Sequence, residues 1–83
     1  MPYYTYILKS ESTGKYYCGQ TDNLEQRLQR HNEGNVKSSK YGRPWVIHCQ
    51  VLCVSRSAAM QLERTIKGRG IARWFSENAG LQG

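Results

Sequence analysis

Charged side chains occupy inward-facing positions of a helix predicted over residues 22–31. Residues at i, i+3, i+4 and i+7 share one face of a helix. On the apolar face of this one, Leu24 and Leu28 alternate with Arg27 and His31. A guanidinium binds phosphate or carboxylate through two parallel hydrogen bonds, and an imidazole exchanges protons near neutral pH. Arg27 and His31 sit beside apolar packing, where an inward-facing polar side chain needs a partner or a function.

A carboxylate occupies the matching face of a later helix, where Glu63 lies in a stripe with Ala59, Leu62 and Ile66. Burying a carboxylate without a partner is costly, so Glu63 requires a cation or a metal ion. Two interpretations follow. Arg27, His31 and Glu63 converge on the face of one sheet, or Arg27 and Glu63 form a structural ion pair at the edge of the core.

Tyrosines concentrate in a hairpin at the start of the chain. Strand residues alternate between faces, so Tyr6 shares a face with Tyr4, and Tyr17 shares a face with Gly19. Tyrosine is common in strands, and packing explains most of these residues. Gly19 is more informative, because a glycine inside a strand marks a bulge or the close approach of another group.

The elements that position these residues follow from periodicity and turn signals. Strands are predicted at 3–9, 15–20 and 45–54, helices from Asp22 to about His31, from Ser55 or Ser57 to about Lys67, and at 71–77, and a loop at 34–44. The order β-β-α-β-α-α predicts an α+β fold with a small three-stranded antiparallel sheet flanked by helices.

Capping residues set the expected helix bounds. Asp22 is predicted to cap the first helix, with Glu25 completing a capping-box variant, and Gly34 to end it. Gly68 and Gly70 are expected to break the second helix. The residues from Asn78 onward are expected to be frayed.

The charge balance favours a polyanionic partner. Twelve Lys and Arg residues face six Asp and Glu residues, a net charge of +6, which suits nucleic acid. The predicted loop carries Lys37, Lys40 and Arg43 without an acidic residue, so they are candidates for contacts to the DNA backbone. A solvated basic loop is the alternative. Lys67, Arg69 and Arg73 either extend this surface or stabilise a helix C-terminus.

Length and composition predict one domain over residues 1–83 that remains in the cytoplasm. No apolar stretch approaches the roughly 20 residues of a membrane span, and no signal peptide is evident. The three cysteines, Cys18, Cys49 and Cys53, have neither disulfide-framework nor zinc-site spacing. Free thiols are expected.

Several of these residues together resemble the GIY-YIG nuclease superfamily. They are Tyr4-Thr5-Tyr6, Tyr17-Cys18-Gly19, Asn23-Leu24 followed by Arg27, His31 one turn later, and the late helical Glu63. The resemblance runs from about Tyr3 to Arg73 and is strongest to small stand-alone members. The catalytic domain of the excision-repair incision nuclease and the amino-terminal domain of certain homing endonucleases share the fold. Tyr4 and Cys18 depart from the name motif, which puts the substrate geometry in doubt more than the activity.

The resemblance implies a metal-dependent DNA endonuclease that hydrolyses phosphodiester bonds. Tyr6 and Tyr17 would line the scissile phosphate, and one of them would orient or deprotonate the attacking water. Deprotonation requires a metal or cation that lowers the tyrosine pKa of about 10. Arg27 would hold the phosphate, and Glu63 would bind one Mg²⁺ or Mn²⁺, which would act as a Lewis acid on the phosphate and the leaving 3′ oxygen. His31 would transfer a proton or contact phosphate, and Lys67 would join the loop cations in binding DNA.

Two other functions remain open from the sequence: a catalytically silent nucleic-acid-binding module of the same fold, and a structural or interaction domain. Because no appended recognition domain is evident, structure-selective cutting linked to repair or recombination is expected, with a protein partner as another source of targeting. A monomer is the default, although Trp45 and the edge strands offer a way to pair two chains.

Overall fold

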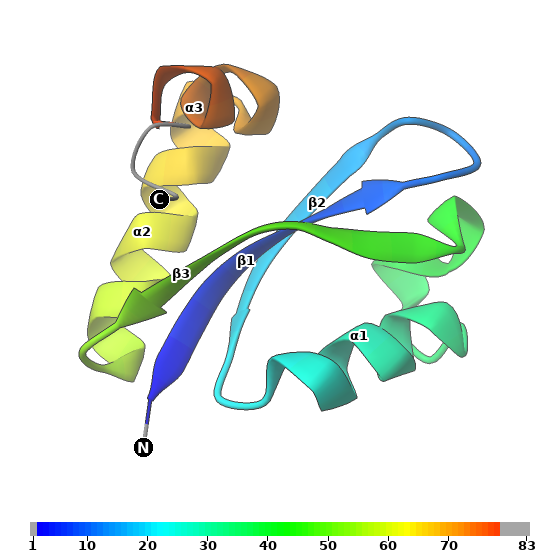
Figure 1. The fold of residues 1–83 in the computed structure, drawn as a ribbon, viewed down its shortest axis with the longest axis horizontal. Helices are drawn as coiled ribbons and strands as arrows, with labels where there is room; N and C mark the ends of the chain where they lie inside the picture. Colours follow the sequence, from blue (N-terminus) through cyan, green and yellow to red (C-terminus); the bar gives the residue numbers. More distant parts are fainter. Residues whose placement is uncertain (1, 79–83) are drawn as a thin grey trace.

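The computed structural model describes residues 2–78, which form three strands and three α-helices with one short 3₁₀ helix (Figure 1). In chain order the elements are β1 (Tyr3–Ser10), β2 (Tyr16–Thr21), α1 (Leu24–Asn32), η1 (Lys37–Gly42), β3 (Trp45–Cys53), α2 (Arg56–Arg69) and α3 (Ile71–Asn78). The α+β fold and its β-β-α-β-α-α order are therefore confirmed, with η1 as an addition.

The sheet has the order β2-β1-β3, and both pairings are antiparallel. Strand β1 lies in the centre, and Tyr6 is the register partner of Gly19 on β2. On the other side, an irregularity between Ile7 and Leu8 shifts the register with β3. Strands β2 and β3 are thus the two edge strands.

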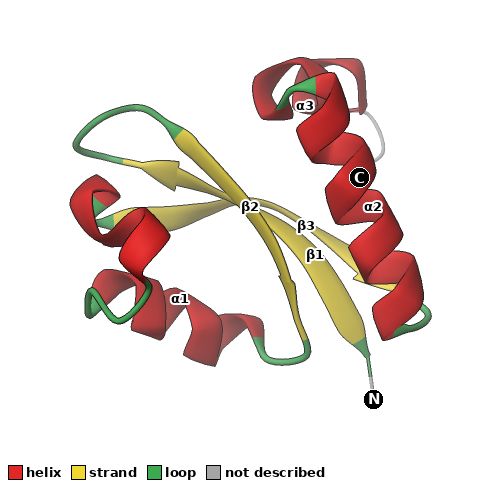
Figure 2. Cartoon of the chain, turned by 180° about the vertical axis from the view of Figure 1, so that it is seen from behind, coloured by secondary structure: helices red, strands yellow, loops and turns green. Residues whose placement is uncertain are grey.

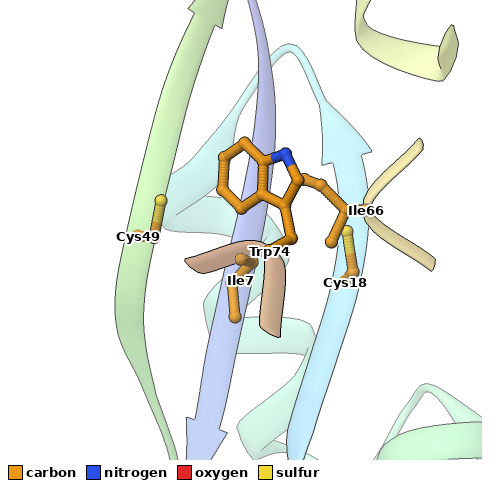
Figure 3. Close-up of a cluster of buried hydrophobic side chains, with 5 residues drawn as sticks. All are labelled: Ile7, Cys18, Cys49, Ile66 and Trp74. Carbon is orange, nitrogen blue, oxygen red and sulfur yellow. The ribbon is translucent and has the colours of Figure 1, made fainter. Parts of the chain in front are cut away.

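The two faces of the sheet are covered by different helices. Figure 2 shows α1 on one side of the sheet and α2 with α3 on the other. The α2–α3 side holds the cluster of buried residues drawn in Figure 3, which are Ile7, Cys18, Cys49, Ile66 and Trp74. The α1 side holds Tyr6, Leu8, Leu24 and Trp45. The predicted alternation along the hairpin strands is therefore correct.

Helix capping differs from the prediction at two points. Asn23, not Asp22, caps α1, because the Asn23 side chain accepts a hydrogen bond from the backbone N–H of Gln26. Ser55 caps α2, as one of the two predicted serines. Gly68 does not break α2, because the helix continues to Arg69. Gly70, at φ 95°, supplies the positive-φ conformation at its end.

The segment predicted as a loop at 34–44 contains η1, so that part of the prediction is wrong. Asn32 clamps α1 to the first residue of β3: its side chain donates to the carbonyl of Trp45 and accepts from the Trp45 N–H. The Trp45 indole N–H in turn donates to the carbonyl of Ser39 in η1 at 2.8 Å. Trp45 is buried by these contacts and does not present the pairing surface that we considered from the sequence.

None of the helices among residues 2–78 has the length and apolar character required to cross a membrane. Cys18, Cys49 and Cys53 are free thiols.

Candidate active site

The hydroxyl of Tyr6 reaches across the edge strand because Gly19 has no side chain. A Cβ atom at Gly19 would lie 2.5 Å from the Tyr6 hydroxyl and 2.7 Å from the adjacent ring carbon. Real side chains do not tolerate such contacts. Gly19 therefore provides the close approach that a glycine within a strand indicates, and the Tyr6 ring lies over β2.

His31 accepts a hydrogen bond from this hydroxyl. The Tyr6 Oη and His31 Nε2 atoms are 3.1 Å apart, and His31 Nδ1 lies 2.6 Å from Ser39 Oγ. Ser39 has one hydroxyl proton and donates it to the carbonyl of Val36. With its proton directed to Val36, Ser39 accepts from Nδ1–H and Nε2 accepts the Tyr6 proton, which is the arrangement that gives every proton of the three side chains an acceptor. The result is a directed chain from Tyr6 through His31 to η1.

Burial holds both members of this pair neutral. Desolvation lowers the pKa of His31 to about 4, assisted by the positive charges of Arg27 and Arg30. The pKa of Tyr6 is raised, first by burial and then by Tyr17, and the lowering effect of Arg27 does not overcome these contributions. Arg27 thus provides the nearby cation that deprotonation of a tyrosine requires. Its effect is too small, and Tyr6 remains a protonated phenol in the free protein.

Tyr17 is the more accessible of the two candidate tyrosines. Its ring packs edge-on against His31, with centroids 4.7 Å apart, and against Trp45 at 6.1 Å. Its hydroxyl accepts a hydrogen bond from Ser38 at 3.5 Å. Tyr17 thus covers the buried pair while its own hydroxyl remains near the surface.

Arg27 and Glu63 approach this site from opposite faces of the sheet. Arg27 lies on α1 and Glu63 on α2, so the prediction of convergence on one face is wrong. Both charges nevertheless affect the pKa of Tyr6, Arg27 lowering it and Glu63 raising it. The two helices flank the sheet on its two sides (Figure 1), and both charges act on the hydroxyl that crosses β2.

Glu63 does not form the structural ion pair with Arg27 that we considered. Its carboxylate accepts a hydrogen bond from Lys67 at 2.7 Å, and its side chain is 22% exposed. It lines a pocket of about 330 Å³ together with Gln20 and Lys67. Because the Glu63 side chain is partly exposed and its partner Lys67 is exposed, the carboxylate remains accessible to an incoming cation.

Gln20 lines the same pocket and carries an oxygen of the kind that suits a hard cation. Its Oε1 is buried and finds no hydrogen-bond partner among residues 2–78, and Mg²⁺ prefers carboxylate and amide oxygens. No cluster of three His, Cys, Asp or Glu residues occurs within the described part of the chain. A metal held by one carboxylate and water or substrate oxygens fits the residues present, which is the usual manner of Mg²⁺ binding.

Cys18 does not offer the oxygen ligand that Mg²⁺ prefers. It is buried next to this pocket, and burial together with the Glu63 charge raises the pKa of its thiol to about 12. A metal-binding cysteine is a thiolate.

The predicted DNA-binding cations fall into two groups. Lys37 and Lys40 are exposed on η1, and across residues 2–78 neither forms an ion pair. Arg43 is also exposed but is folded back, donating to the carbonyl of Lys40 at 2.9 Å. Lys67 pairs with Glu63, whereas Arg69 and Arg73 pair with Glu77. Lys37 and Lys40 are therefore the best placed to contact phosphate.

Two residues with roles in this site were missed from the sequence. Ser39 lies within the segment predicted as a loop, and Gln20 lies at the end of a predicted strand, where neither residue type indicates a role. A signal existed for Gln20, since alternation places it on the same side of β2 as Cys18, facing α2. Nothing in the sequence paired Ser39 with His31.

Comparison with known proteins agrees with this geometry. The family model for the GIY-YIG catalytic domain matches residues 2–73. The structure-specific endonuclease subunit slx1 of Schizosaccharomyces pombe is 35% identical over 82 residues, which cover 90% of this chain and 30% of slx1. This chain thus spans about a third of that relative.

Two bacterial proteins match over more of their length. A UPF0213 protein of Staphylococcus haemolyticus is 39% identical over 66 residues, covering 78% of this chain and 79% of that protein. The solution structure of a UPF0213 protein from Bacillus halodurans superposes with a TM-score of 0.59 at 29% identity, covering all of this chain and 87% of its own.

Proposed function

Because the chain belongs to the GIY-YIG family, we propose that it is an endonuclease that hydrolyses phosphodiester bonds in DNA. The observation that carries the proposal is the Tyr6–His31–Ser39 chain, which places a neutral imidazole acceptor 3.1 Å from the buried Tyr6 hydroxyl, over Gly19 of the edge strand β2. A purely structural histidine would not require a tyrosine that crosses a glycine to reach it.

Tyr6 acts in this mechanism as a proton relay. Its raised pKa means that the phenol remains protonated and donates to His31 Nε2. As water attacks phosphorus, its proton passes to the Tyr6 oxygen while the Tyr6 proton passes to Nε2. The hydroxide equivalent forms the new P–O bond, the bond to the leaving oxygen breaks, and no net charge remains on Tyr6.

Arg27 and Glu63 act on the phosphate from the two sides of β2. The Arg27 guanidinium neutralises the charge that develops on the nonbridging oxygens. Glu63, with Gln20 beside it, would hold one Mg²⁺ or Mn²⁺, which when bound supplies Lewis-acid polarisation of the phosphate. Lys67 would then release Glu63 and turn toward the DNA backbone.

The substrate class is proposed from a relative. The S. pombe protein is named as a subunit of a structure-specific endonuclease, and we extend structure selectivity to this chain. The exposed cations of η1 support binding to the DNA backbone rather than reading of sequence.

A cleavage assay tests the proposal. Purified protein is incubated with Mg²⁺ or Mn²⁺ on labelled duplex, single-stranded and branched DNA, beside Glu63→Gln and Arg27→Met. We expect metal-dependent cutting by the wild type, none by either variant, and retained DNA binding by Glu63→Gln. Salt-sensitive binding without cutting of any substrate would contradict the enzyme assignment, unless an added partner protein restores cleavage.

A further inference from the structure

A second pocket adjoins the candidate active site and has no role in the mechanism above. It has a volume of about 230 Å³ and lies between β2, the end of the hairpin turn and η1. Its lining includes Lys15, Tyr17, Ser38, Tyr41 and Trp45. Tyr17 belongs to both sites, so a molecule in this pocket lies directly beside the position proposed for the phosphate.

The floor of the pocket is rigid. Trp45 is buried and held by its hydrogen bond to the Ser39 carbonyl, and it packs edge-on against Tyr17. Gly42 allows this arrangement, because a Cβ atom there would overlap the Trp45 ring. The floor is therefore preformed, as in most binding sites for small planar ligands.

Tyr41 lines the pocket on the solvent side, and its ring is almost fully exposed. It is 87% exposed, whereas Trp45 is 5% exposed. An aromatic ring so exposed contributes nothing to the core. It can stack on a planar ligand that enters between it and the buried wall, and base–aromatic stacking is a common basis for binding unpaired nucleotides.

The charge around the pocket selects an anionic strand. Lys15 lines the opening, Lys37 and Lys40 lie on the same 3₁₀ helix as Tyr41, and none of the lining residues is acidic. The volume is smaller than the roughly 300–1,000 Å³ of pockets for drug-sized ligands, so it admits one planar group rather than several. The hydroxyl of Ser38 offers a hydrogen bond to its edge.

We propose that this pocket binds one unpaired nucleobase of the strand that is cut, next to the scissile phosphate. A base within a duplex cannot enter without leaving its stack and its pair. The pocket would therefore favour flaps, gaps and branch points over continuous duplex. This inference rests on the proposed function and gives it a physical source of structure selectivity.

Binding of oligonucleotides that carry 2-aminopurine tests the proposal. The probes are a flap substrate and the matching continuous duplex, with the fluorescent base moved one position at a time across the cleavage position, bound to the Glu63→Gln protein. The variants are Tyr41→Ala and the matched Tyr41→Phe, in the same background. Because Tyr41 is exposed, neither change affects the core.

We expect the fluorescence of 2-aminopurine to change on binding at one flap position only, and Tyr41→Ala to abolish that change. Affinity for the flap should fall on the order of 10-fold with Tyr41→Ala, while Tyr41→Phe and the duplex affinity stay near wild type. Equal losses on flap and duplex, or no loss on either, would overturn this inference and leave the nuclease proposal intact. Failure of the protein to bind any DNA would overturn both.

Discussion

His31 Nδ1 donates a hydrogen bond to Ser39 Oγ over 2.6 Å, and both side chains are buried at the junction of α1 and η1. This bond decides which nitrogen of His31 is free. With Nδ1 protonated, Nε2 points at Tyr6 as an acceptor. In the proposed mechanism Ser39 is thus a positioning residue. It orients the His31 imidazole, which accepts the proton, and does not itself contact substrate.

Replacing Ser39 by alanine should therefore lower turnover more than DNA affinity. Without its acceptor, Nδ1–H is unpaired, and the imidazole loses its fixed orientation. We expect kcat to fall on the order of 10-fold or more with KM for DNA nearly unchanged. The control is Ser57→Ala, at an exposed position of α2 that contacts none of the residues of this site. Equal kcat values in the two variants would show that the His31–Ser39 bond has no catalytic role.

The neutral state of His31 should make stability depend on pH. Its pKa is lowered to about 4, so between pH 6.5 and 4 the unfolded chain takes up a proton that the native protein does not. The contribution of neutral His31 to the free energy of unfolding is complete above about pH 6.5 and is lost as the pH falls toward 4. It should amount to on the order of 3 kcal/mol.

Urea denaturation across this range, beside His31→Gln, measures the effect. The variant should lose most of the pH dependence. A smaller part should remain, because burial and Lys9 also lower the pKa of His48. Identical slopes for the wild type and His31→Gln would contradict the assignment of a neutral, buried His31.

Gly19 and Gly68 should respond in opposite directions to alanine. At Gly19 the new methyl group collides with Tyr6, and such overpacking typically costs about 1–3 kcal/mol. Gly68 lies within α2 and a Cβ atom there meets nothing within 4 Å, so alanine should stabilise by about 0.5–1 kcal/mol. Chemical denaturation measures both changes in the free energy of unfolding. If Gly19→Ala were as stable and as active in cleavage as the wild type, the close contact between Tyr6 and Gly19 would not be required.

Metal affinity should depend on Gln20 as well as Glu63. Leucine at position 20 fills similar space without the unpartnered oxygen. We expect the dissociation constant for Mn²⁺, measured calorimetrically, to rise about 10-fold, in the range found for groups that support a metal site. Gln61→Leu, on the exposed surface of α2, is the matched control. An unchanged constant for Gln20→Leu would exclude the amide from the site.

The unpaired lysines of η1 should account for part of the salt dependence of DNA binding. Replacing both Lys37 and Lys40 by glutamine removes two phosphate contacts, which should reduce the slope of log K against log salt by about 1.4–1.8. Replacing Arg69 and Arg73, which pair with Glu77, should change the slope much less. A similar change in both double variants would indicate that net charge alone controls binding.

Local patterns in the sequence determined the helices and strands and the face of each on which a side chain lies. Periodicity placed Arg27, His31 and Glu63 toward the sheet, and strand alternation placed Tyr6 with Tyr4 and Tyr17 with Gly19, because both periods are properties of the local backbone. The predicted N-cap of α1 was wrong by one residue, because Asp22 and Asn23 have side chains that cap a helix about equally well. The 3₁₀ helix was missed because its polar residues lack a periodic apolar signal.

Only the tertiary structure decided how these residues combine. Whether α1 and α2 cover the same face or opposite faces depends on the path of the chain between them, which no local pattern records. Strand β3 lies between the two helices in the sequence and pairs with β1 on the side away from β2. The helices that precede and follow β3 cover opposite faces, so Arg27 and Glu63 lie on the two sides of the sheet. The pairing of His31 with Ser39, the unpartnered oxygen of Gln20 and the exposure of Tyr41 likewise depend on contacts between segments that are separate in the sequence.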